Sequence, residues 1–127
     1  MSKAKVYRLG DLQLRIMKVL WERQEATVSD VHGALGKQDF AYTTVATMLR
    51  KMEARGLVKH REDGRSFVYR AVVAVARVNR SMADHLVDRL FEGSLADAVA
   101  HLLTTRDVSP EELSKLEKLI AEKKKSG

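Results

Sequence analysis

The sequence predicts a mostly α-helical protein with one small β-hairpin, divided into residues 1–71 and residues 72–127. Two observations lead to this prediction. Apolar residues recur at three- and four-residue spacing along most of the chain, which is typical of amphipathic helices. Between residues 57 and 72 the spacing changes to two, and β-branched and aromatic residues dominate, which indicates strands. The expected order is therefore three helices, a hairpin and three further helices.

The first two helices are predicted by their apolar faces and by their ends. A helix from Leu9 to about Glu22 carries apolar residues at helical spacing: Leu9, Leu12, Ile16, Val19, Leu20 and Trp21. A second, shorter helix follows. Thr27 can cap its start, with Asp30 three residues later, and Gly36 suits its end because glycine readily adopts the positive φ that often terminates a helix.

The segment AYTTVATMLRKMEARGLV, residues 41–58, predicts a third helix that ends at Gly56. On a helical projection, Val45, Leu49 and Met52 share the side that must face the core. The opposite side carries only hydroxyls and cations: Thr43, Thr44, Thr47, Arg50 and Lys51. A solvated helix face usually mixes both signs of charge, whereas these five positions include no carboxylate, so they indicate a binding surface.

Two β-rich runs, LVKHR and SFVYRAV, predict the hairpin. The residues EDGR lie between them, and the pair Asp63-Gly64 is expected to close a tight turn. Arg65 and Ser66 would then lie at the tip. Three helices followed directly by a hairpin describe a winged helix-turn-helix, in which the third helix enters a DNA groove and the hairpin, or wing, follows the sugar-phosphate backbone.

Residues 72–127 predict three more helices, and Ser94 and Ser109 are the expected N-caps of the last two. A segment of this size cannot cover three broad apolar faces well by itself. We therefore expect a helical dimerisation domain in which a second copy covers Met82, Leu86, Leu90, Leu103, Leu116 and Leu119. The alternative is that these residues pack back onto the first part and form one compact monomer.

The charge is distributed unevenly along the chain. The net charge is +6, and residues 1–71 contain fourteen Lys and Arg against eight Asp and Glu, while residues 72–127 contain nine of each kind. A basic first part favours a polyanionic partner, although solubility alone can account for a modest excess. Cysteine is absent, which excludes thiol chemistry and Cys-based zinc sites, and no long apolar run occurs, so a cytoplasmic location is expected.

These features together predict sequence-specific binding of double-stranded DNA. Small hydroxyl side chains allow close approach to the major groove, and Arg can bind guanine through two hydrogen bonds. The expected DNA-contacting residues are Tyr42, Thr43, Thr44, Thr47, Arg50, Lys51, Arg65 and Ser66. The main alternative is a winged-helix module that docks to another protein. No phosphate loop, nucleophile motif or catalytic constellation is recognisable, so neither an enzyme nor a cofactor is predicted.

The four histidines suggest no strong metal site. Asp84, His85 and Asp88 share one predicted helix and have a spacing that can bind a divalent metal, but such a pattern is more often an ordinary polar face, so no metal is predicted. His60 lies near the wing, where a phosphate contact is a minor alternative. His32 is expected to be a solvated residue near the middle of the second helix.

The runs LGDLQLRIMKVLWERQEATVSDVHGAL and AYTTVATMLRKMEARGLVKHREDGRSFVYRAVV resemble the penicillinase repressor family of BlaI-, MecI- and CopY-type winged-helix transcriptional repressors. The resemblance continues through LVDRLFEGSLADAVAHLL and VSPEELSKLEKLI. It rests on the order and spacing of Leu12, Trp21, the TTV run at 43–45, Leu49, Gly56-Leu57-Val58, Gly64-Arg65 and Tyr69. It implies a homodimeric repressor whose winged helix binds a palindromic operator and whose C-terminal helices dimerise.

The resemblance leaves the releasing signal open. In the β-lactam branch a protease cuts an Asn-Phe bond shortly before the last helix, and His101-Leu102 stands at the corresponding place here. A protease that demands Asn-Phe should not recognise this pair, so a sensor protease and a cleavage at His101-Leu102 remain open alternatives. Copper-responsive members end in cysteine motifs, which this chain lacks. The inducer is therefore undetermined at this stage.

Overall fold

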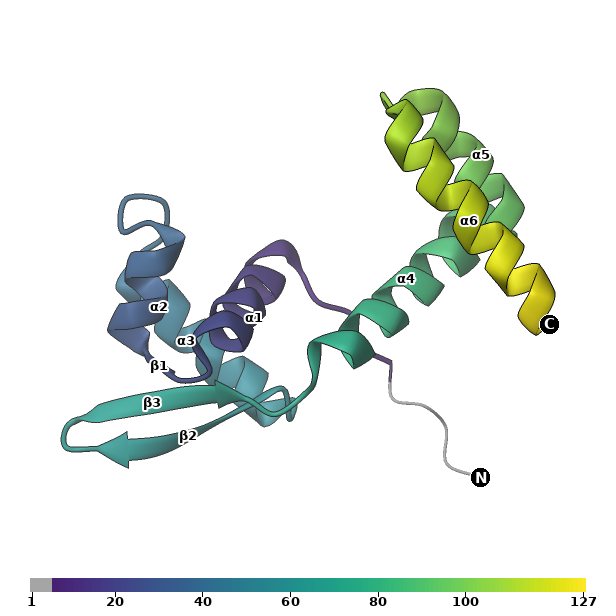
Figure 1. Ribbon diagram of the computed structural model, residues 1–127. Coiled ribbons are helices and arrows are strands. Elements are labelled where there is room, and N and C mark those ends of the chain that lie inside the picture. The colour runs from purple at the N-terminus through teal and green to yellow at the C-terminus, as the bar shows by residue number, and fades with distance from the viewer. Residues whose placement is uncertain (1–5) are drawn as a thin grey trace. The chain divides into compact units, whose positions relative to one another are not determined.

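The computed structural model describes residues 6–127 (Figure 1). The chain forms two compact units, of which the first ends at Asp84 and the second runs from His85 to Gly127. Helix α4, Val75–Phe91, contributes to both, because its first half packs with the first unit through the buried side chain of Val78. The predicted functional division after residue 71 therefore falls before the boundary between the compact units, and it stays a prediction.

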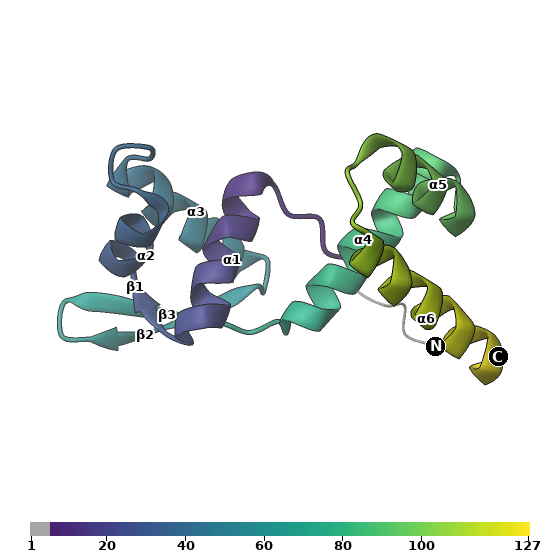
Figure 2. The same cartoon turned by 45° about the horizontal axis from the view of Figure 1, so that its top comes forward.

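Apart from one short additional strand, the first unit has the element order that the sequence predicts. It consists of α1 (Asp11–Arg23), β1 (Ala26–Thr27), α2 (Val28–Leu35), α3 (Tyr42–Ala54), β2 (Val58–Asp63) and β3 (Ser66–Ala71). The strands form an antiparallel sheet in the order β1-β3-β2. Figures 1 and 2 show the hairpin of β2 and β3 alongside the three helices. The prediction of a mostly helical fold with a small hairpin wing is confirmed.

The ends of α2 follow from local sequence. The Thr27 hydroxyl accepts a hydrogen bond from the Asp30 amide at 3.1 Å, and the Asp30 carboxylate accepts one from the Thr27 amide at 3.0 Å. This reciprocal capping box satisfies two N–H groups that have no partner within the helix. Gly36 follows the last turn with a φ of 103°, a conformation that is costly for residues with a Cβ.

The apolar faces of the three helices meet the inner side of the sheet. The largest fully buried side chains are Tyr69, Ile16, Met17, Leu20, Leu49, Met52, Leu57, Val31, Val45, Val58 and Val78. The predicted inner side of α3 is therefore confirmed. Trp21 lies at the edge of this core, where its indole Nε1 donates a hydrogen bond to the Val73 carbonyl oxygen at 2.8 Å.

The hairpin differs from the prediction by one position. Asp63 pairs with Ser66 in the strand register, so the two-residue loop is Gly64-Arg65 and not Asp63-Gly64. Gly64 has a φ of 63°, and glycine at the first central position is typical of a type II′ turn, whose twist matches that of the strands. The short strand β1 was not predicted; it pairs Ala26 with Tyr69.

The second unit contains the second half of α4 together with α5 (Leu95–Thr105) and α6 (Pro110–Ser126). Ser94 and Ser109 cap these helices as predicted, because each hydroxyl accepts a hydrogen bond at 3.1 Å from the backbone amide three residues later. Ala98 is the one buried side chain in residues 85–127, all of which the structure describes. Across residues 6–127, none of the helices has both the length and the apolar character needed to cross a membrane.

Candidate nucleic-acid interface

The outward side of α3 is exposed along its whole length. Val45, Leu49 and Met52 are buried, while all six predicted contact residues of this helix are exposed to solvent: Tyr42, Thr43, Thr44, Thr47, Arg50 and Lys51. The helix is therefore oriented as the projection predicts, with hydroxyls and two cations facing outward. Glu53 is its single acidic residue. The role of the six residues in DNA binding stays a prediction at this point.

The cations of α3 keep most of their hydrogen-bonding capacity. Arg50 donates through Nη2 to the Thr47 hydroxyl oxygen at 3.3 Å, which holds its guanidinium along the outer face. Within the described part of the chain, neither Arg50 nor Lys51 forms an ion pair. A guanidinium carries five N–H donors, so Arg50 retains donors for a base edge or a phosphate.

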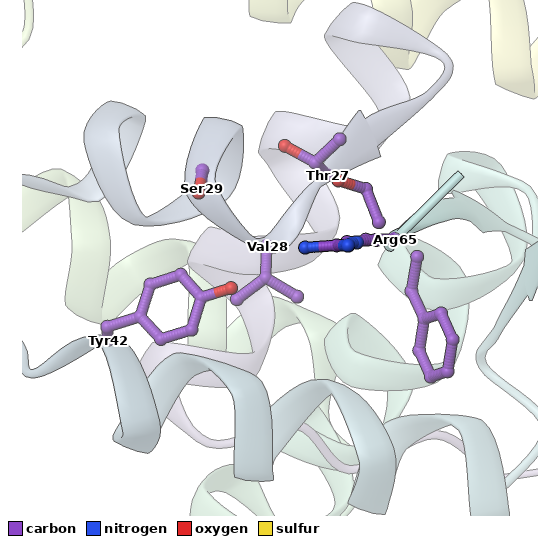
Figure 3. Close-up of a pocket in the computed structure, with 7 residues that line it drawn as sticks. Thr27, Val28, Ser29, Tyr42 and Arg65 are labelled. Carbon is purple, nitrogen blue, oxygen red and sulfur yellow. The ribbon is translucent and has the colours of Figure 1, made fainter. Parts of the chain in front are cut away.

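A surface pocket of about 210 Å³ lies where three segments distant in sequence meet. It is lined by Thr27, Val28, Ser29, Tyr42, Arg65, Ser66 and Phe67. Figure 3 shows the Tyr42 hydroxyl and the Arg65 guanidinium both directed into the space between the start of α2, the start of α3 and the wing. A cation beside several hydroxyls suits an anion such as a phosphate.

Arg65 and Arg61 differ in their partners, although both belong to the hairpin. Arg61 donates a hydrogen bond from Nη2 to the Glu25 carboxylate at 2.8 Å and lies 4.0 Å from Asp63. The hydrogen bond and the positive charge of Arg61 lower the pKa of the Glu25 carboxyl. Arg65 forms no hydrogen bond or ion pair with any residue between 6 and 127. Of these two arginines, Arg65 is therefore the one that is available to a ligand.

Two of the histidines have defined structural partners. His32 was expected to be solvated, and this prediction is wrong: its Nε2 lies 2.7 Å from the Phe40 carbonyl oxygen, and its ring meets the Tyr42 ring edge-on at 5.7 Å. It thereby supports the turn that leads into α3. His60 contacts Glu53 of α3. Among residues 6–127, no group of three or more His, Cys, Asp or Glu side chains is arranged to hold a metal ion.

The residues predicted for dimerisation are mostly uncovered in the single chain. Leu86, Leu90 and Leu119 expose 45%, 69% and 60% of their surface, Leu103 is exposed, and Leu116 is half-buried. Met82 differs, because it is half-buried against the core of the first unit. Four further exposed apolar residues of the second unit were not predicted to take part in dimerisation: Leu95, Leu102, Leu113 and Ile120.

The pair His101-Leu102 lies inside α5 and not in a loop. Both residues are exposed, and the His101 ring lies 5.6 Å from the Phe91 ring. A protease requires an extended chain in its active site, so cleavage here demands local unwinding of α5. The side chains of this bond are accessible, whereas its backbone is held in helical hydrogen bonds.

The sequence reasoning missed Thr27, Val28, Ser29 and Phe67 as parts of the pocket, and it missed the contact between Glu53 and His60. No local pattern reveals either feature, because each joins residues from separate elements. The capping motif at Thr27 was recognisable, but it indicates a helix start and carries no information about which loop or strand will lie against it.

Comparisons with known proteins agree with this architecture. The penicillinase repressor of Bacillus licheniformis is 26% identical over 121 residues, which span 94% of each chain. The transcriptional regulator BlaI of Mycobacterium tuberculosis is 39% identical over 99 residues, and this match covers 76% of the present chain and 63% of that protein. The solution structure of the DNA-binding domain of the repressor BlaI matches with a TM-score of 0.51 at 28% identity, covering 59% of this chain and 93% of that one.

A family model described as penicillinase repressor matches residues 9–122, which is most of the chain. Together with these relatives, the match confirms the predicted resemblance and the prediction of a sequence-specific DNA-binding transcriptional repressor that is not an enzyme. Since the match extends through both compact units, the chain belongs to the penicillinase repressor family.

Proposed function

We propose that this protein is a homodimeric repressor that binds a palindromic operator through the outer side of α3 and the tip of the wing. The observation that carries the proposal is the outward face of α3. There, hydroxyls and two cations that form no ion pair with residues 6–127 stand opposite a fully buried apolar side. A face of this composition complements the hydrogen-bonding groups and the negative charge of a major groove.

The contact residues divide into two roles. Thr47 and Arg50 lie on the part of α3 opposite the core and are proposed to read base edges, because Arg can donate two hydrogen bonds to guanine and the threonine methyl can meet the methyl of thymine. Lys51 and the threonines near the helix start are proposed to contact phosphates. Contacts of the second kind set affinity and register, and they carry no sequence information directly.

The pocket beside the wing is proposed to receive a backbone phosphate. Arg65 supplies a cation without a partner among residues 6–127, and the hydroxyls of Tyr42, Ser29 and Ser66 supply donors. Charge-assisted hydrogen bonds from Arg are among the strongest that proteins form with phosphate. The acidic residues Glu62 and Asp63 precede the turn on the same hairpin, so β2 itself adds little attraction for a phosphate.

Residues 72–127 are proposed to form the dimerisation domain. The support is the large exposure of Leu86, Leu90 and Leu119, because soluble monomers rarely leave several large apolar side chains of consecutive helices uncovered. Two winged helices related by a twofold axis read a palindrome, which one copy cannot do. Of the predicted set, Met82 contributes least, since the first unit already covers it in part.

The bond between His101 and Leu102 is the candidate point at which release from the operator begins. A sensor protease that cut between His101 and Leu102 would separate Leu103, Leu116 and Leu119 from the rest of the chain and thereby dissolve the dimer. The helical setting of this bond favours a signal that first opens α5. Because the proposed partner is operator DNA, we assign the protein to the cytoplasm.

The test is a titration of the protein with its own upstream DNA and with scrambled DNA of equal length, repeated over a series of salt concentrations. The mass of the complex is measured alongside. A preference of about a thousandfold or more, with two protomers bound per site, is the expected result. Equal, weak binding to both DNAs would reject the proposal and favour the alternative, a winged-helix module that docks to a protein.

A further inference from the structure

The recognition helix α3 contains one carboxylate, and it lies next to the arginine that is proposed to read a base. Glu53 follows Arg50 by three residues, and residues with this spacing are neighbours on a helix surface. An acidic side chain here can pair with Arg50 and can also repel phosphates. The location of the Glu53 carboxylate therefore decides how much of the Arg50 charge is available to DNA.

In the structure the carboxylate is bound by a residue of the wing. The His60 Nδ1 lies 2.6 Å from one Glu53 carboxylate oxygen and 2.9 Å from the other. The two side chains are 28% and 30% exposed, so water screens the contact only in part. Arg50 has no contact with Glu53 at ion-pair distance and donates to Thr47 at 3.3 Å instead.

The His60 ring is held in place by two aromatic rings of β3. It stacks on Phe67 with the centroids 4.2 Å apart and the planes 21° apart, and it lies 5.4 Å from the Tyr69 ring. Tyr69 is its direct partner in the strand register. The imidazole therefore has little freedom to leave the carboxylate, and the interaction joins the wing to the last turns of the recognition helix.

The charged groups around His60 come from two elements besides its own. From α3 they are Glu53 and Arg50, and from β3 the Tyr69 hydroxyl, whose pKa is raised by burial and by the charge of Glu53 and lowered by Arg50. On β2 itself, Glu62 shares the side of the strand that carries His60. The neighbouring cations of β2, Lys59 and Arg61, alternate onto the other side.

We propose that His60 is a positioning residue for DNA recognition, because its hold on Glu53 keeps the carboxylate away from Arg50 and leaves the guanidinium free for a base edge. This inference rests on the proposed function. The contact at 2.6 Å and the stacking of the His60 ring on Phe67 together fix the place of the Glu53 carboxylate.

The test is a double-mutant cycle on the full-length protein, read as operator affinity. His60→Gln releases the carboxylate toward Arg50 and is expected to weaken operator binding about five- to tenfold. The variant that combines His60→Gln with Glu53→Gln has no carboxylate to release, so it is expected to bind within about twofold of the wild type. If His60→Gln weakened operator binding only because packing was lost, the double variant would bind the operator at least as weakly as His60→Gln.

Two further measurements separate positioning from a structural role. In His60→Gln, the loss should be largest at the base pair whose recognition Arg50→Ala also abolishes, and Glu53→Gln alone should bind the operator at least as tightly as the wild type. Glu62→Gln is the matched control, because it removes one negative charge from the same side of β2 without touching the Glu53 contact. It should strengthen binding to all DNAs alike.

The outcomes distinguish this inference from the proposed function. If the wild type prefers its operator but the double variant does not recover, or if the loss in His60→Gln is uniform over all base pairs, this inference is overturned and the operator assignment stands. If the wild type has no preference for its operator, both fail. Should His60→Gln prove unfolded in a thermal melt, Glu53→Gln still decides, because operator binding weaker than that of the wild type contradicts the inference.

Discussion

Thr27 and Asp30 cap the start of α2 with two reciprocal hydrogen bonds. The Thr27 hydroxyl accepts a hydrogen bond from the Asp30 amide, and the Asp30 carboxylate accepts one from the Thr27 amide. The pair also sets the start of α2 beside the wing, because Thr27 belongs to the pocket with Arg65. A local capping motif thus fixes the position of one wall of a site whose other walls come from distant segments.

The capping box should make the free energy of unfolding of the protein depend on pH in the acidic range. Hydrogen bonds from the Thr27 amide and hydroxyl lower the pKa of the Asp30 carboxyl in the folded state. Its stabilising contribution is therefore present above the pKa of an unfolded aspartate and is lost as the pH falls through the lower, folded value. In urea unfolding followed by circular dichroism from about pH 7 to about pH 3, Asp30→Asn should flatten this decline.

Asp107→Asn is the control for this measurement, because Asp107 forms no hydrogen bond or ion pair with another residue of the range 6–127. Thr27→Ala should lower the free energy of unfolding by about 1 kcal/mol at neutral pH. Parallel acid profiles for the wild type and Asp30→Asn would show that the carboxylate contributes nothing to the cap.

Substitutions on the outer face of α3 should separate base reading from phosphate binding. Arg50→Ala or Thr47→Ala should reduce discrimination at one operator base pair by about 1–3 kcal/mol. Lys51→Ala should instead weaken binding to every sequence and make the slope of log affinity against log salt shallower by about 0.9. Electrophoretic or fluorescence titrations on operators with single base changes provide the measurement. Intact operator binding in all three variants would mean that a different surface contacts DNA.

Arg61 and Arg65 of the hairpin should differ in their effect on the salt dependence of DNA binding. Arg65 has no partner in the described chain and lines the pocket. Arg65→Ala should therefore make the slope of log affinity against log salt shallower, by the amount expected for the loss of about one phosphate contact. Arg61 is held by Glu25 at 2.8 Å, so Arg61→Ala should leave the slope unchanged. Equal slopes for the two variants would contradict the assignment of the pocket to a phosphate.

The exposed leucines of the second unit should control the oligomeric state. Leu86→Asp introduces a charge where the proposed dimer excludes water, so it should shift the protein to monomers and remove most of the operator affinity. Sedimentation velocity measures the first effect and a DNA titration measures the second. The winged helix should keep its helical circular dichroism, because Leu86 lies beyond its core.

Val6→Asp serves as the control for the dimer prediction. Val6 is also an exposed apolar residue, but it precedes α1 and belongs to the first unit. The variant should remain dimeric. If Leu86→Asp also stays dimeric, or if it loses all helicity, the assignment of DNA binding to residues 1–71 and of dimerisation to residues 72–127 is wrong.

The elements that the sequence predicted well are those whose causes are local. Amphipathic spacing located α1 and α3, because burying one face of a helix requires apolar residues every three or four positions. Caps marked the starts of α2, α5 and α6, since a serine or threonine hydroxyl reaches the backbone amide only three residues away. The error of one position at the turn arose because Asp63 still finds a partner across the hairpin.

What the sequence by itself determined is the order of the elements, the outward cations and hydroxyls of α3, and the family to which the chain belongs. Tertiary structure alone decided which of these groups meet. It set Arg65 beside Tyr42, it bound Glu53 to His60, and it left Arg61 with Glu25 and Arg65 without a partner in residues 6–127. The physical reason is that pairing of charges depends on distances between side chains of different elements, and those distances exist only once the shared core has fixed the helices against the sheet.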